Sequence, residues 1–146
     1  MTVPLLVPDA SVLLKWVLES DDEENRDCAA EIRHSWLSGS CRIVVPSLWA
    51  FEVGNIIGMK EPRLGGELME ILIEYGFEEE PPETFYKKAL ELMRDFKVTF
   101  YDAAYHAIAL NRSGTFITAD ADYVRKTSRA GHVMRLADWS RPNEGR

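Results

Sequence analysis

The chain has 146 residues, of which 46% are hydrophobic and 28% charged, and its formal net charge is −7. This length and composition fit one domain with its own core, and no segment resembles a signal peptide or the roughly 20-residue apolar run of a membrane helix. We therefore expect a cytoplasmic protein without membrane contact. The acidic charge argues against broad, sequence-independent binding to nucleic acids, but a nuclease whose carboxylates hold metal ions stays compatible with it.

The first apolar segment, residues 3–8, ends at a carboxylate, Asp9, and leads directly into a helical pattern at 11–18. A short apolar run of this kind is typical of a strand that is buried on both faces of a parallel sheet. Ligands of such sheets bind outside the carboxyl ends of the strands, which is where Asp9 lies. The acidic run at 19–24 is a weaker candidate, because consecutive acids near a helix start usually face water.

Strand and helix patterns alternate along the rest of the chain. Further strands are predicted at 42–45, 115–118 and 132–136, with a weak edge strand at 77–80. Helices are predicted at 28–37, 48–59, 68–75, 83–96, 102–111 and 123–128. This order predicts a single-domain α/β protein, a three-layer α/β/α sandwich around a mostly parallel sheet, over residues 1–139. Residues 140–146 are expected to form a polar C-terminal tail.

Four acids have similar positions in this order. Asp9 and Asp120 each follow a strand, and Glu52 lies in the first turns of the helix at 48–59. The helix that begins at Asp102 runs back toward the start of the strand at 115–118. The N-terminal end of this helix, which carries Asp102, therefore lies near the carboxyl edge of that strand. Because helices that follow parallel strands begin at this edge, we expect the four side chains to share one rim of the sheet.

Each acid also has a purely structural interpretation. Asp9 can cap the helix after it, Thr99 and Asp102 fit a capping-box-like pattern, Asp120 fits a turn, and Glu52 can reach solvent from the edge of its helix. The agreement of all four on one edge favours a functional site. Grouped carboxylates repel one another, and hard oxygen ligands with little His or Cys select Mg²⁺ or Mn²⁺. Such a site can activate water for attack on a phosphodiester.

Four segments resemble the PIN-domain family, in particular its VapC-type toxin ribonucleases. They read VPDASV at 7–12, PSLWAFEVGN at 46–55, TFYDAAY at 99–105 and FITAD at 116–120, and the resemblance extends over roughly residues 3–139. Each segment alone is weakly specific, whereas all four in this order are strongly specific. The resemblance implies a PIN-like fold and an Mg²⁺- or Mn²⁺-dependent endoribonuclease that hydrolyses RNA as the toxin of a toxin–antitoxin pair.

The resemblance also implies roles for individual residues. The family's acidic quartet, which acts in catalysis and holds the metal, corresponds to Asp9, Glu52, Asp102 and Asp120. The polar residues that support the quartet correspond to Ser11, Asn55 and Thr118. Asp122 is a second choice for the fourth acid, and Asp120 is preferred because it lies nearer the strand end. A homodimer and a small antitoxin, with a segment that occupies the active groove, are implied as well.

Two other functions stay open. The chain could be a PIN-like binding or regulatory module without turnover, or a phosphotransferase with Asp9 as nucleophile, although such enzymes commonly carry a second acid where this chain has Ser11. His106 lies one helical turn after Asp102 and could orient a ligand, but packing is the preferred interpretation. The cations available for RNA are Lys15, Lys60, Arg63, Arg125, Lys126 and Arg129.

Overall fold

The computed structural model describes residues 2–19 and 25–141, so most of the predicted acidic run and all but two residues of the predicted tail lie outside the described residues. Five strands form one sheet in the order β3-β2-β1-β4-β5. Their bounds are β1 (Leu5–Pro8), β2 (Arg42–Pro46), β3 (Glu78–Glu80), β4 (Thr115–Thr118) and β5 (Val133–Arg135). Each of the four strand pairings is parallel, which confirms the predicted sheet.

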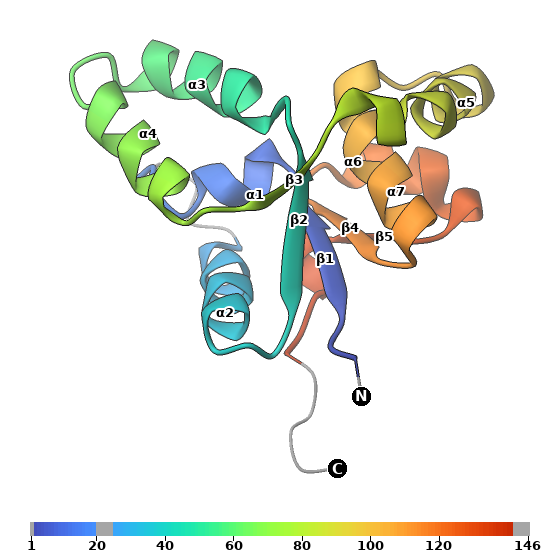
Figure 1. Cartoon of the computed structure of the whole chain (residues 1–146), viewed down its shortest axis with the longest axis horizontal. Helices are drawn as coiled ribbons and strands as arrows, with labels where there is room; N and C mark the ends of the chain where they lie inside the picture. Colours follow the sequence, from blue (N-terminus) through green and yellow to red (C-terminus); the bar gives the residue numbers. More distant parts are fainter. Residues whose placement is uncertain (1, 20–24, 142–146) are drawn as a thin grey trace.

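Helices cover both faces of this sheet. Figure 1 shows α1 to α4 on one side and α5 to α7 on the other, so the three-layer α/β/α sandwich is confirmed. Their bounds are α1 (Ala10–Leu14), α2 (Arg26–Leu37), α3 (Trp49–Lys60), α4 (Gly65–Glu74), α5 (Tyr86–Phe96), α6 (Phe100–Arg112) and α7 (Ala121–Thr127). None of the helices within residues 2–19 and 25–141 combines the length and the apolar character that crossing a membrane requires.

Two predicted helices differ in the structure. The helix expected at 11–18 is regular only as far as Leu14 and continues as turns. The helix expected at 83–96 is divided into a 3₁₀ turn, Pro82–Thr84, and α5, because Phe85 between them has a φ of −131° that no helix can include. Phe85 is almost completely buried, so its anchoring in the core accounts for the break.

The core lies on both faces of β1 and β4. Val7, Phe116 and Ile117 have no exposed surface, as expected for central strands of a parallel sheet. Helix α6 packs against β1, β2 and β4, and its residues from Ala103 to Ala109 are all buried. The small alanines of this helix let its backbone approach the sheet closely, which places the first turn of α6 above the end of β1.

The strand order changes direction next to β1. The chain passes from β1 to β2 on one side and later returns to β4 on the other. The backbone N–H of Asp9 donates to the carbonyl of Ile117 at 3.1 Å, which continues the pairing of β1 with β4 one residue past the strand. The connections after β1 and β4 therefore leave the sheet in different directions, and such a switch point is where open α/β sheets bind ligands.

Candidate active site

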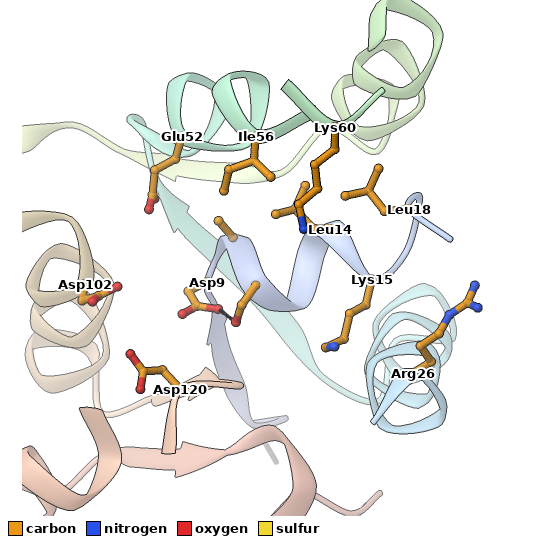
Figure 2. A pocket seen from close by; sticks show the side chains of 12 residues that line it. Asp9, Leu14, Lys15, Leu18, Arg26, Glu52, Ile56, Lys60, Asp102 and Asp120 are labelled. Atoms are coloured by element: carbon orange, nitrogen blue, oxygen red, sulfur yellow. Dashed lines mark hydrogen bonds between the residues drawn. The ribbon is translucent and has the colours of Figure 1, made fainter. Parts of the chain in front are cut away.

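A cleft of about 550 Å³ opens at this switch point, and all four predicted acids line it (Figure 2). Asp9 directly follows β1, and Asp120 lies two residues past β4. Glu52 and Asp102 lie in the first turns of α3 and α6. The structure thus brings together side chains that are separated by more than 100 positions in the sequence.

Asp9 is the most buried of the four acids, with 6% of its surface exposed. Its Oδ1 accepts hydrogen bonds from the Ser11 hydroxyl at 2.5 Å and from the Val12 N–H at 3.4 Å. Burial raises the pKa of Asp9 from 3.8 to about 7, and the charge of Asp102 adds to this, while hydrogen bonds from Ser11, Thr118 and Val12 oppose it. Asp9 therefore caps α1 and lines the cleft at once, so its structural and functional interpretations do not exclude each other.

Two of the predicted supporting residues hold the loops that carry the acids. The Ser11 hydroxyl, which donates to Asp9, also accepts the Ala119 N–H at 3.1 Å and so ties the start of α1 to the loop after β4. Thr118 is buried, and its hydroxyl accepts the Asp120 N–H at 3.1 Å. The relative positions of Asp9 and Asp120 are fixed by these contacts.

Glu52 has a partner that the sequence did not indicate. The hydroxyl of Tyr105 donates to Glu52 Oε1 at 2.9 Å, and Tyr105 itself is completely buried. Burial raises the pKa of Glu52 and the charge of Asp102 adds to it, while the Tyr105 hydrogen bond opposes both. The available signal was the position of Tyr105, three residues after Asp102 and hence near it on one side of the same helix.

Asp102 lies at the electrostatic centre of the group. Burial raises its pKa, with a further contribution from the charge of Asp120, and the charge of Asp102 in turn raises the pKa of Asp9 and of Glu52. Its backbone N–H is capped by the Thr99 hydroxyl at 3.3 Å. Asp120 caps α7 through its Oδ1, which accepts the Tyr123 N–H at 3.1 Å. Asp102 therefore interacts electrostatically with each of the other three acids.

Other predicted residues lie elsewhere. Asn55, which the resemblance implies as a supporting residue, is exposed on α3 and is not among the described residues that line the cleft. Asp122 is exposed, pairs with Arg125 at 3.0 Å and also lies outside the cleft lining.

His106 has the packing role that was preferred for it. Its ring is fully buried, with Nδ1 2.8 Å from the Tyr123 hydroxyl and Nε2 2.7 Å from the Gly131 carbonyl. Because a carbonyl only accepts, Nε2 carries the hydrogen and Nδ1 accepts from the tyrosine. Burial lowers the pKa of His106, so the ring is held neutral.

The far end of the cleft is basic and apolar. Lys15 and Lys60, two of the cations suggested by the sequence, line it together with Arg26, which was not suggested. The remaining suggested cations, Arg63, Arg125, Lys126 and Arg129, are exposed and do not line the cleft. The apolar part of the lining is formed by Leu14, Leu18 and Ile56.

The acids have the donor chemistry of a hard divalent ion. The described residues that line the cleft include neither His nor Cys, and none of the four carboxylates forms a salt bridge with another described residue. Oxygen donors of this kind suit Mg²⁺ or Mn²⁺. As the side chains stand, no three acids, histidines or cysteines among the described residues are close enough to hold one ion, so coordination requires rotation of the acids toward one another.

Comparison with known proteins agrees with this architecture. The family model of the PIN domain matches residues 6–129. A structure of PAE2754 from Pyrobaculum aerophilum is 22% identical, with a TM-score of 0.62, and the alignment covers 93% of this chain and 91% of that one. A toxin–antitoxin complex from Klebsiella pneumoniae is 14% identical, with a TM-score of 0.65 and coverage of 90% and 97%.

A structure of FitAB bound to an IR36 DNA fragment is 15% identical, with a TM-score of 0.66 and coverage of 94% of this chain and 99% of that one. Comparison with curated proteins gives no significant match. At these identities the structural similarities support the fold alone, whereas the family model matches most of the chain. The chain therefore belongs to the PIN-domain family.

Proposed function

We propose that this protein is a metal-dependent endoribonuclease and the toxin of a toxin–antitoxin pair. The observation that carries the proposal is the convergence of Asp9, Glu52, Asp102 and Asp120 on one cleft without a salt-bridge partner among the described residues. Burial raises the pKa of three of these acids and repulsion from a neighbouring acid adds to it, and a bound cation relieves such repulsion. Membership of the PIN-domain family supports a nuclease, because PIN domains are generally nucleases that use divalent ions.

The roles of the residues follow from their positions. Asp9, Asp102 and Asp120 would hold an Mg²⁺ or Mn²⁺ ion, which when bound polarises a phosphodiester oxygen and lowers the pKa of water. Glu52 has one oxygen fixed by Tyr105, which leaves the other to contact the ion through water or to orient the attacking water. Ser11 and Thr118 keep Asp9 and Asp120 in place through the hydrogen bonds described above.

The biological setting is proposed on the resemblance of the fold. A small antitoxin partner is supported by the similarity to the Klebsiella pneumoniae structure, which is itself a toxin–antitoxin complex. We place the PIN domain at residues 1–139 and expect a cytoplasmic homodimer. Expression of the wild-type chain should arrest growth, and expression of Asp9→Asn should not. Equal arrest by both chains would contradict a toxin that acts through this site.

The nuclease is tested by incubating total RNA with the purified protein in Mg²⁺ or Mn²⁺ and in EDTA, and by mapping the cut ends. Cleavage should occur only with the ion and should be lost in Asp9→Asn. Asp122→Asn is the matched control, since it removes an exposed carboxylate outside the cleft. Equal cleavage by Asp9→Asn would contradict the mechanism, and metal binding without cleavage across a broad RNA panel would favour the non-catalytic module.

A further inference from the structure

The two ends of the cleft differ in charge. Figure 2 shows Asp9, Asp102 and Asp120 together at one end, and Lys15, Lys60 and Arg26 at the other. Leu14 and Leu18 lie near Lys60, and Ile56 lies between Glu52 and Lys60. A single cleft thus passes from a group of carboxylates to a group of cations over the length of α1.

A second cavity, of about 240 Å³, continues the basic end. It is lined by Lys15, Trp16, Arg26, Asp27, Ala30 and Arg33. Because Lys15 and Arg26 line both cavities, the basic lining is continuous from the cleft, past α1, to the exposed side of α2. We call the four cations Lys15, Arg26, Arg33 and Lys60 the basic strip. Among the described residues that line the second cavity, Asp27 is the one acid, in a chain whose net charge is −7.

We propose that the basic strip binds the phosphates of single-stranded RNA that flank the bond to be cut. This inference rests on the proposed nuclease function and adds the path of the substrate. When the scissile phosphate of an RNA chain lies at the acids, the neighbouring phosphates also come close to these negative charges. Cations beside those phosphates offset the resulting repulsion. The strip provides cations in the same cleft, at the end opposite the acids.

The same observation explains how an acidic protein can bind RNA. Contacts from Lys and Arg to phosphates supply affinity and fix the position of a strand without reading its sequence. Elsewhere the negative charge of the chain disfavours RNA, so binding is confined to the strip. The described residues that line the cleft include no aromatic side chain, so they offer no surface for base stacking. Trp16 lines the second cavity, where its indole N–H donates to the Ala29 carbonyl at 2.9 Å. The strip is therefore a source of affinity more than of sequence preference.

The test is the affinity for a fluorescein-labelled single-stranded RNA of mixed sequence, measured by anisotropy on the full chain in an Asp9→Asn background that does not cut. Arg33→Glu is the main variant, because Arg33 lines the second cavity and not the cleft. We expect binding to weaken by about tenfold at 50 mM salt, and the slope of log K against log salt to fall by about 0.7. Lys60→Glu, at the end of α3, is an independent second variant with the same expectation.

Lys87→Glu is the matched control. Lys87 is exposed on α5, which Figure 1 places on the opposite side of the sheet from α2, and the substitution changes the net charge by the same amount. The control should bind RNA within about twofold of the parent. If Arg33→Glu and Lys60→Glu both bind like the control with an unchanged salt slope, the inference is wrong, and an acidic peptide becomes the better occupant of the strip.

Binding and cleavage separate this inference from the proposed function. RNA affinity that depends on the strip, in a wild type that cuts no RNA, would support the inference and contradict the nuclease. RNA cleavage by the wild type, with affinity independent of the strip, would contradict the inference alone. A parent chain that binds no RNA would overturn the inference directly.

Discussion

The protein has two groups of acids with opposite surroundings. On the edge strand β3, Glu78 pairs with Arg42 at 2.9 Å and with Arg112 at 2.8 Å, and Glu79 accepts a hydrogen bond from the Trp49 indole at 2.7 Å. Arg112 also lies 3.7 Å from Glu80. The hydrogen bond from Arg112 lowers the pKa of Glu78, so the charged form of Glu78 is stabilised.

The acids of the cleft are the reverse case. They are far apart in sequence, no described residue forms a salt bridge with them, and burial raises the pKa of Asp9, Glu52 and Asp102. The difference teaches that three consecutive glutamates can be an ordinary edge whose acids have partners within the chain. Scattered acids that the fold brings together without a salt bridge to a described residue indicate a site instead. Carboxylates held in this way are stabilised by a cation that comes from outside the chain.

The largest expected difference is between a variant that removes one charge from the cleft acids and a variant that removes one charge from the β3 acids. Asp9→Asn should reduce the rate of RNA cleavage by at least about 100-fold, because a metal ligand is lost. Asn caps a helix as well as Asp does, so the cap of α1 is retained. Glu78→Gln should leave the rate within about twofold of the wild type. Initial rates at saturating Mg²⁺ test both variants, and a comparable loss in Glu78→Gln would erase the distinction between the two groups.

The second-largest expected effect is on the pH dependence of stability, to which Asp9 of the cleft should contribute. The raised pKa of Asp9 means that its contribution to stability is complete below pH 4 and is lost as pH rises through about 7. In EDTA, the melting temperature of the wild type should therefore fall between pH 5 and pH 8 by about 5 °C more than that of Asp9→Asn.

The control for this measurement is internal. The lowered pKa of His106 gives the opposite slope at acidic pH, because the buried ring resists protonation, and this slope is common to both chains. The difference between the two melting curves therefore reports Asp9. Parallel curves across the whole range would show that Asp9 has no raised pKa.

A third comparison concerns the fourth acid. Asp120→Asn should reduce cleavage by about tenfold while keeping the cap of α7, because Asn also accepts the Tyr123 N–H. Asp122→Asn should have little effect, since Asp122 faces solvent beside Arg125. Rates measured side by side decide between the two residues. A larger loss of cleavage in Asp122→Asn than in Asp120→Asn would contradict the choice of Asp120 as the fourth acid of the site.

The smallest expected effect lies on β3. Arg112→Met leaves Glu78 with Arg42 as its one described cationic partner and leaves Glu80 without one, so the free energy of unfolding should fall by about 1 kcal/mol with cleavage unchanged. Arg94→Met, which removes an exposed pair with Asp95, is the control and should leave stability unchanged. Urea denaturation measures both, and reduced cleavage in Arg112→Met would link β3 to the site.

The order of strands and helices could be predicted because hydrophobic periodicity is local. The parallel sheet and the shared edge of Asp9, Glu52, Asp102 and Asp120 followed from that order. Tyr105 could not be assigned, because its partner Glu52 is 53 positions away in the chain. The exposure of Asn55 could not be predicted either, because spacing along α3 does not tell which neighbouring elements cover each of its residues.

The binding of Mn²⁺ tests most directly whether the cleft acids form a cation site. Isothermal titration calorimetry should detect binding to the wild-type chain, at least about tenfold weaker binding to Asp9→Asn, and unchanged binding to Glu78→Gln. Absence of binding to the wild type, or equal affinity for the wild type and Asp9→Asn, would contradict a cation site built on Asp9.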